Sequence, residues 1–246
     1  MKLYGKNPVI ERIKTNPASI RKIYLQKKTD LSEIVREAKK QALDFESVEK
    51  SRILSMARNV HTQGVVAEVA EFKYAPFSEL LDDCGKRKTS LLFLDGITDP
   101  QNLGSIIRNL ACMGGFSIVL PEHNSAQVNE TVLRVACGGE NYIKIGQVAN
   151  NARAIEKAKA RGVWIIGAVA GSGKDIQQVK VKFPLGVVIG SEGKGIRPGL
   201  VKHIDAELSL PMKGAALSYN ASVAAVLVCY EINRQERLKN EGYQNT

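Results

Sequence analysis

The chain has 246 residues, of which 44% are hydrophobic and 24% are charged. This composition excludes wholesale disorder, and the length allows one or two domains with a sizeable core. No apolar run approaches the roughly 18 residues that a membrane helix needs, and the N-terminus lacks the apolar stretch of a secretory signal, so we expect a cytoplasmic protein. The formal net charge of +10 indicates a polyanionic partner, most simply nucleic acid, although a well-solvated surface would give the same value.

The first 73 residues are the more basic part of the chain and show the pattern of a small α/β domain. They carry 15 basic and 9 acidic side chains, a net charge of +6, whereas the remaining residues carry a net +4. Periodicity and turn residues predict, in order, a helix over 8–15, a strand over 20–26, a helix over 30–42 capped by Asp30, a strand over 45–48, a helix over 51–57 and a strand over 65–69. Residues 74–90 hold a short helix and then a Gly, Lys, Arg and Ser stretch, which predicts a linker.

From residue 91 the pattern changes to apolar strands that alternate with helices. We predict strands over 91–95, 116–120, 163–169, 184–190 and 207–211, and helices over 103–113, 128–136, 150–160 and 222–239. Apolar strands with helices between them are typical of a parallel sheet that is covered on both faces. The sequence therefore predicts an α/β fold with a second domain over 91–246.

The cysteines and histidines do not suggest a metal site. The four cysteines lie far apart without any C-x-x-C pair, and the three histidines are isolated from one another, so we expect no bound metal and no disulfide framework. Cys112, Cys137 and Cys229 stand among apolar residues and are predicted to be reduced thiols of the core.

Two common cofactor-binding motifs are missing. Residues 168–175 (AVAGSGKD) resemble a phosphate-binding P-loop, but Ala168 and Asp175 stand where that motif needs Gly and Ser or Thr. No G-x-G-x-x-G follows a predicted strand, so an ordinary dinucleotide site is not supported either.

A first polar segment, LDGITDPQNLGSIIRNLACMGG over 94–115, begins where a predicted strand ends. Asn102 and Gly104 stand at the start of the following helix, and Arg108 lies one helical turn further on. Polar residues in this position lie at the carboxyl edge of a parallel sheet, where open α/β proteins bind ligands. A capped helix start with a surface arginine explains the segment equally well when it is taken alone.

Two later segments share this placement. Residues 187–200 (VVIGSEGKGIRPGL) surround one carboxylate, Glu192, with glycines that let backbone groups approach a ligand, and a simple turn is the alternative. Residues 208–231 (LSLPMKGAALSYNASVAAVLVCYE) contain a nearly apolar helix, and Ser218 and Asn220 stand at its start. Either residue could simply cap the helix, which is the alternative to a functional role. A helix this apolar belongs to a core or an interface, and it suits a homodimer contact.

In this order, the three segments resemble the motifs of the SpoU-type RNA ribose 2′-O-methyltransferases of the SPOUT superfamily. The matches are D-P-Q-N-L-G with Arg108 downstream, I-G-S-E-G-K-G-I, and L-P-M-K-G followed by S-Y-N-A-S-V-A. The part over 1–73, with YGKNPVIERI near its start and HTQGVVAEV at its end, is similar to the L30e-like RNA-binding domain of the bacterial 23S rRNA methyltransferases and their relatives. The chain departs from the family pattern at Tyr219, where Leu is usual, and at Asn109, where Thr is common.

The resemblance implies a SPOUT fold in which residues of about 186–231 form a trefoil knot, and a homodimer that pairs through the catalytic domain. It also implies that the knot loops bind S-adenosylmethionine. Carried over residue by residue, backbone contacts to this cofactor fall at Gly190, Leu210 and Tyr219, with Met212 as a wall of the site.

The implied reaction is methyl transfer to a ribose 2′-hydroxyl of structured RNA, with a guanosine of 23S rRNA as the first expectation. A hydroxyl is a poor nucleophile until its proton is drawn away. In the family, the residue at Arg108 is the proposed base or the group that organises one; a fork-like contact with an RNA phosphate is physically easier, because arginine loses its proton only above about pH 12. Asn102 would orient the ribose or Arg108, and Glu192 would hold Arg108 or the loop. Ser218 and Asn220 would position the 2′-hydroxyl and the motif loops.

Other functions stay open at the level of sequence. A non-catalytic RNA-binding assembly factor would use the same scaffold, and cofactor binding would separate it from an enzyme. The substrate could also be a transfer RNA. A SPOUT enzyme that methylates a base nitrogen is disfavoured by the pairing of Asn102 with Arg108.

Overall fold

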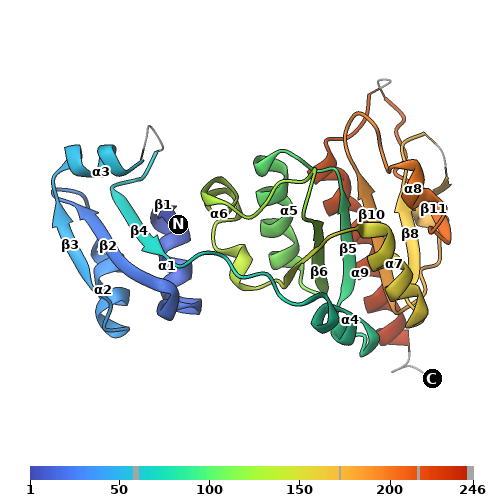
Figure 1. Ribbon diagram of the computed structural model, residues 1–246, viewed down its shortest axis with the longest axis horizontal. Coiled ribbons are helices and arrows are strands. Elements are labelled where there is room, and N and C mark those ends of the chain that lie inside the picture. Colours follow the sequence, from blue (N-terminus) through green and yellow to red (C-terminus); the bar gives the residue numbers. More distant parts are fainter. Residues whose placement is uncertain (58–60, 172, 215–216, 243–246) are drawn as a thin grey trace.

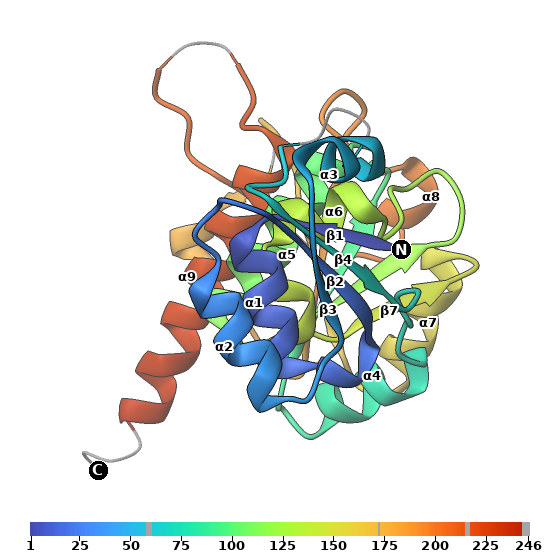
Figure 2. The same ribbon diagram turned by 90° about the vertical axis from the view of Figure 1, so that its left-hand side faces the viewer.

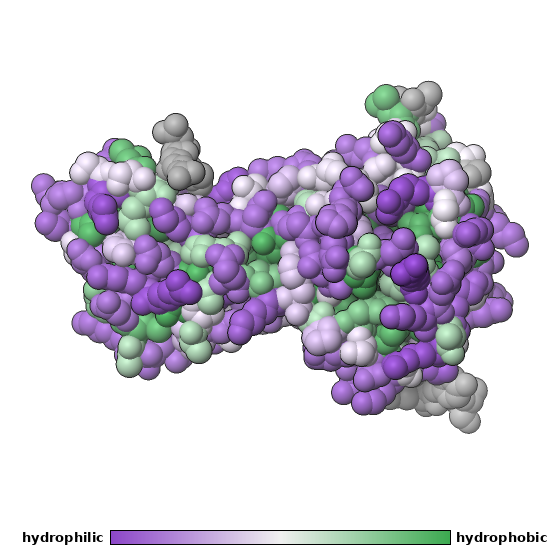
Figure 3. All heavy atoms as spheres, in the orientation of Figure 1, coloured by the Kyte–Doolittle hydropathy of each residue, from purple (hydrophilic) through white to green (hydrophobic). Residues whose placement is uncertain are grey.

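The computed structural model describes residues 1–57, 61–171, 173–214 and 217–242, with the backbone alone for 240–242. Two units lie side by side along the long axis of the molecule, each built on its own sheet (Figure 1). The surface of both is mainly hydrophilic in the view of Figure 3, and the molecule narrows between them.

The first unit is a four-stranded sheet with helices on both faces. Its elements are β1 (Lys2–Tyr4), α1 (Lys6–Thr15), the 3-10 helix η1 (Pro17–Ser19), β2 (Ile20–Gln26), α2 (Ser32–Lys40), β3 (Phe45–Val48), α3 (Lys50–Ala57) and β4 (Val65–Val69). The strand order is β1-β4-β2-β3, with only β2 and β3 parallel (Figure 2). Val9, Ile13 and Ile34 pack α1 and α2 on one face, and Ile53 and Met56 pack α3 on the other.

The second unit is a seven-stranded sheet in which every pairing is parallel, as predicted. The strand order is β7-β6-β5-β10-β8-β11-β9. Its elements are α4 (Phe77–Gly85), β5 (Ser90–Asp95), α5 (Pro100–Met113), β6 (Phe116–Pro121), α6 (Glu130–Ala136), η2 (Gly139–Asn141), β7 (Ile145–Val148), α7 (Asn151–Ala160), β8 (Trp164–Ala168), β9 (Lys174–Asp175), η3 (Ile176–Gln178), β10 (Leu185–Gly190), α8 (Pro198–Val201), β11 (Ala206–Ser209) and α9 (Ala221–Gly242).

Helices cover both faces of this second sheet. Leu103 of α5 and Val228 of α9 are buried in the core on one face, and Leu80 of α4, Ile155 of α7 and Leu200 of α8 are buried on the other. The alternation of apolar strands with helices in the sequence predicted a sheet covered by helices on both faces, and the structure has these three layers. Within the described ranges, no helix is long and apolar enough to cross a membrane.

The structure differs from the expectations at several elements. β1, β7 and β9 were not predicted: β1 and β9 have only three and two residues, and Gly146 and Gln147 interrupt the apolar pattern of β7. The helix expected over 30–42 begins at Ser32, and Asp30 instead holds the preceding turn by accepting from the Ser32 N–H at 3.2 Å. The short helix expected within 74–90 is present as α4, and its Leu80 and Cys84 are fully buried in the core of the second unit.

One prediction about the cysteines is wrong. Cys229 is buried and Cys137 is half-buried, but Cys112 is exposed. Cys112 lies half a turn of α5 away from the buried side formed by Leu103, Ile106 and Leu110, so its apolar neighbours in sequence face the core while it faces solvent. Burial raises the pKa of the Cys229 thiol, as expected for a core cysteine.

Candidate active site

The three polar segments meet at one edge of the seven-stranded sheet. They follow β5, β10 and β11; β5 and β10 are neighbours, and β8 alone separates β10 from β11. The chain builds β6 and β7 on one side of β5 and then returns to build β8 to β11 on the other, so the strand order reverses between β5 and β10. Such a reversal opens a crevice at the carboxyl ends of the strands, the usual ligand site of open α/β sheets.

Asn102, Glu192 and Asn220, one from each segment, form a hydrogen-bonded cluster at this edge, which we call the Asn–Glu–Asn cluster. The Nδ2 atom of Asn102 donates to Oε1 of Glu192 at 3.0 Å. The Nδ2 atom of Asn220 donates to the same oxygen at 2.5 Å and to Oδ1 of Asn102 at 3.0 Å. The backbone N–H of Ala221 also donates to Glu192 Oε1, at 3.1 Å. The cluster therefore joins all three segments.

Helix caps place two members of this cluster. Asp99 caps α5 and Pro100 occupies its first turn, so Asn102 stands at the edge of the sheet. Asn220 caps α9, because its Oδ1 accepts from the N–H of Ser222 at 2.9 Å. Asn220 thus uses its oxygen as a cap and its Nδ2 in the cluster, so the capping interpretation and a role at the site are compatible.

A cavity of about 380 Å³ opens beside the cluster, in the size range of small-ligand sites. The residues expected to contact a cofactor all line it: Gly190, Leu210, Met212 and Tyr219. Glu192 and Ser218 also line it. Most of the remaining wall is apolar side chain or glycine backbone, with few polar groups, a composition that binds the apolar parts of an organic ligand.

Gly190 of the second segment packs closely against backbone at one wall of this cavity. A Cβ at Gly190 would lie 2.1 Å from the carbonyl carbon of Gly195, so only glycine fits there. Ser191 and Gly195 exchange backbone hydrogen bonds of 3.1 and 2.9 Å, which fold residues 190–195 into a tight hairpin. Gly193, by contrast, meets nothing within 4 Å, so packing does not require glycine at that position.

Arg108 lies apart from the Asn–Glu–Asn cluster. It comes six residues after Asn102 on α5, which turns it toward a different side of the helix. Its Cα packs against η2, where a Cβ at Gly139 would lie 3.1 Å away. Burial raises the pKa of the nearby Cys137 thiol, and the charge of Arg108 opposes that rise. The guanidinium is exposed and makes no hydrogen bond or ion pair within the described part of the chain, so it is available to an external anion.

An ion pair that no sequence pattern indicated ties the second segment to the end of β5. The buried carboxylate of Asp95 accepts from Nε of Arg197 at 2.6 Å and from the Arg197 N–H at 2.9 Å. In the sequence, D-G and R-P are visible only as turn signals, and nothing marks these residues as partners. Among the described residues, no group of three or more His, Cys, Asp or Glu side chains could hold a metal ion.

Known proteins match the chain over both units. A family model described as the SpoU rRNA Methylase family matches residues 89–230, and one described as RNA 2′-O ribose methyltransferase substrate binding matches residues 2–75. YacO of Bacillus subtilis, whose name assigns it provisionally to the TrmH family of tRNA/rRNA methyltransferases, is 35% identical over 94% of both chains.

Solved structures share the fold. The SpoU methyltransferase AviRb of Streptomyces viridochromogenes, in complex with AdoMet, matches with a TM-score of 0.78 at 23% identity, over 96% of this chain and 90% of that chain. The TrmH/SpoU tRNA modifying enzyme of A. aeolicus matches with a TM-score of 0.55 at 27% identity, over 67% of this chain and 84% of that one.

The fold, the site at the strand reversal and both family models agree on one kind of enzyme, an RNA 2′-O-ribose methyltransferase. The chain belongs to the SpoU rRNA methylase family. The family resemblance and the enzyme class expected from the three segments are confirmed.

Proposed function

We propose that this protein methylates the 2′-hydroxyl of a ribose in structured RNA, with a guanosine of 23S rRNA as the target. The observation that carries this proposal is the contact of the Asn–Glu–Asn cluster with the apolar cavity, since Glu192 belongs to both. A polar cluster beside an apolar cofactor cavity provides one place for the donor and an adjacent place for a hydroxyl acceptor.

The methyl donor is S-adenosylmethionine, and the cavity fits it. The 190–195 hairpin supplies close-packed backbone, and Leu210, Met212 and Tyr219 supply apolar walls for a planar base and its ribose. When bound, this cofactor supplies an electrophilic methyl group. Tyr219 replaces the Leu that is usual in the family without closing the cavity.

The contacts refine the roles expected for the site residues. Of the two roles considered for Glu192, they favour holding the motif loops, because its carboxylate binds Asn102 and Asn220 rather than Arg108. Asn102, held by that carboxylate, orients the ribose, and Ser218 at the cavity wall positions the 2′-hydroxyl. Arg108 binds an RNA phosphate as a planar fork, since its guanidinium has no partner within the described ranges.

The first unit supplies much of the RNA affinity and none of the cofactor site. The cavity is lined only by residues between 168 and 224, all of them in the second unit. Lys28, Lys50 and Arg52 of the first unit are exposed, and their side chains make no hydrogen bond or ion pair within the part that the structure describes. Such free cations suit contacts with RNA phosphates. The boundaries of the RNA-binding domain (1–73), the linker (74–90) and the catalytic domain (91–246) stay predictions.

We further propose that the protein is a homodimer that pairs through α9, and that residues of about 186–231 form a trefoil knot. Val223, Leu227 and Tyr230 are between 39% and 56% exposed and lie along one side of α9, a stripe that a second copy would cover. Residues 215–216 of the proposed knot lie outside the described residues.

Mapping of 2′-O-methyl groups in total RNA, with and without the gene, tests the proposed function. We expect one methyl group of 23S rRNA to disappear and to return when purified protein and S-adenosylmethionine are added. Loss of a methyl group from a transfer RNA would replace the ribosomal target. Unchanged methylation, with RNA binding but no cofactor binding, would instead indicate an assembly factor.

A further inference from the structure

A buried ion pair joins the two units. Nη2 of Arg12 in α1 lies 2.7 Å from Oε1 of Glu140 in η2, and each residue is only 5% exposed. Nε of Arg12 and Oε2 of Glu140 have no hydrogen-bond partner in the described part of the chain. A buried ion pair that leaves polar atoms without hydrogen bonds contributes little to the free energy of unfolding. We therefore interpret this pair as a contact that holds the two units in one relative orientation among several.

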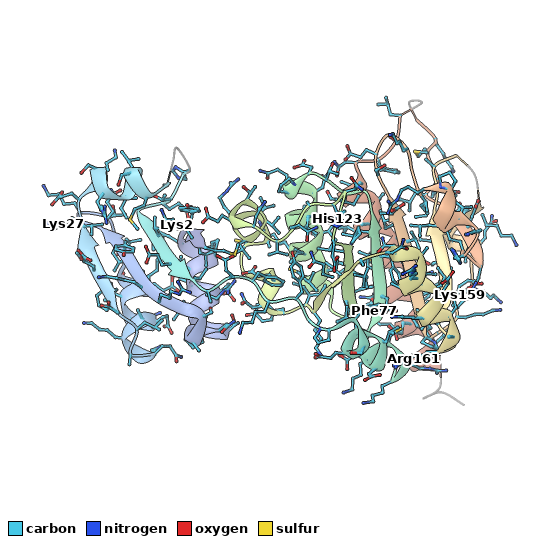
Figure 4. The ribbon with its side chains drawn as sticks, in the orientation of Figure 1. Lys2, Lys27, Phe77, His123, Lys159 and Arg161 are labelled. Carbon is cyan, nitrogen blue, oxygen red and sulfur yellow. The ribbon has the colours of Figure 1, made fainter. Side chains whose placement is uncertain are left out.

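Further contacts flank this ion pair. A Cβ at Gly138 would lie 2.4 Å from Cβ of Glu11, so α1 rests directly on the backbone there. The hydroxyl of Tyr142 donates to Oε2 of Glu11 at 2.8 Å. At the other end of the interface, the N–H of Lys2 donates to Oε1 of Glu130 in α6 at 2.7 Å, and Lys2 lies on the side of the first unit that faces α6 (Figure 4). Contacts at both ends fix the orientation of the units as well as their distance.

The same stretch of chain supports Arg108. Gly138 and Glu140 contact α1 of the first unit, whereas Gly139 between them contacts α5: a Cβ there would lie 3.1 Å from Cα of Arg108 and 3.3 Å from the carbonyl oxygen of Ile107. One short segment is therefore packed between the RNA-binding unit and the turn that carries the proposed phosphate-binding arginine.

We propose that this interface, formed by Glu11 and Arg12 against Gly138 and Glu140 and called here the docking interface, determines which nucleotide is methylated. It sets the place where RNA held by the first unit meets Arg108 and the cavity. Units joined only by a flexible chain would offer many nucleotides to the site, whereas one fixed arrangement offers one. Arg12 and Glu140 are thus positioning residues, and this inference rests on the function proposed above.

The first test compares two glycine variants, Gly138→Ala and Gly162→Ala. Both positions have positive φ, +93° and +78°, so alanine strains the backbone at both. Only the Cβ at position 138 collides with the first unit, since nothing lies within 4 Å at position 162.

For Gly138→Ala we expect kcat at the native nucleotide to fall roughly 100-fold and neighbouring nucleotides to be methylated, because small misplacements of reacting groups are costly. The affinities for RNA and S-adenosylmethionine should stay within about threefold. Gly162→Ala should leave all four quantities unchanged.

The second test reverses the charges of the ion pair. Glu140→Lys places two cations in contact, and we expect it to reproduce the loss of kcat and of site selectivity. Arg12→Glu combined with Glu140→Lys restores opposite charges and should recover most of both. Small-angle scattering of the full chain should show one compact arrangement in the natural protein and a larger maximum dimension in Gly138→Ala and Glu140→Lys.

Two results would overturn the inference. One is native rate and site selectivity in both Gly138→Ala and Glu140→Lys. The other is scattering that shows freely moving units in the natural protein. Absence of methyl transfer by the natural protein on any RNA would contradict the proposed function instead, and the scattering would still decide whether the units are docked.

Discussion

Nδ2 of Asn102 lies 3.0 Å from Oε1 of Glu192, although 90 residues separate them in the chain. The contact joins the start of α5 to the hairpin that follows β10. Because the same oxygen accepts from Asn220 and from the N–H of Ala221, a single carboxylate oxygen holds the three motif segments together. Glu192 is therefore the junction on which the shape of the site depends.

Glu192→Gln should weaken S-adenosylmethionine binding by roughly 1 to 2 kcal/mol, because hydrogen bonds to a charged acceptor are about twice as strong as neutral ones. Titration calorimetry measures the effect. Glu33→Gln, which alters an exposed carboxylate on α2, is the control and should bind the cofactor normally. Equal affinities in the two variants would show that the junction does not shape the cavity.

Arg108→Ala should abolish methyl transfer while cofactor affinity stays within a few-fold of normal, because Arg108 lies outside the cavity. Arg108→Lys should rescue little, since an ammonium group cannot make the planar two-point contact with phosphate. Arg153→Ala, at an exposed arginine of α7, should change stability by no more than about 0.5 kcal/mol and leave the rate unchanged. Full activity in Arg108→Ala would remove this residue from the mechanism.

Asn220 combines two roles that substitution can separate. Asn220→Ser keeps a capping oxygen but loses the Nδ2 contacts, so we expect near-normal thermal stability with reduced methyl transfer. Asn220→Ala loses both and should also cost about 1 kcal/mol of unfolding free energy. If Asn220→Ser retains full activity, the cap is the only role of this residue.

Replacing Lys28, Lys50 and Arg52 by Gln should weaken RNA binding and reduce the slope of log K against log salt by about 2 to 3, because each phosphate contact contributes about 0.7 to 0.9. The control replaces the three exposed cations of 86–88, which precede β5 at the opposite edge of the sheet from the site. A larger effect of the control would place the main RNA surface on the second unit.

Replacing Val223 and Leu227 by Lys should convert the proposed dimer into a monomer, because each puts a charge into the apolar stripe of α9. Light scattering at micromolar concentration measures the mass. Leu54→Lys, at an exposed leucine of α3, should not change it. A monomeric natural protein would contradict the proposed pairing.

Local sequence was sufficient for much of the secondary structure and for the three motif segments. The strands at 20–26, 45–48 and 65–69 were predicted with the observed bounds, because alternation and apolar runs depend on near neighbours. Each segment contains its own glycines, prolines and helix-capping residues. These local features were enough to predict that the segments follow strands and to identify the family that they resemble. For the same reason Cys112 was misjudged, since its apolar neighbours in sequence said nothing about which side of α5 it occupies.

Pairings across long stretches of chain were decided only by the tertiary structure. Asn102 with Glu192, Asp95 with Arg197, and Arg12 with Glu140 are each joined across at least 90 residues. A side chain's local pattern does not encode a distant partner, because that partner depends on the order of strands in the sheet and on how two separately patterned units dock. Local patterns in the sequence were therefore enough to predict the family and the α/β class, which are confirmed, and to propose site residues, whose roles stay predictions. The fold decided that Glu192 holds the two asparagines while Arg108 stands apart, beside the interface with the first unit.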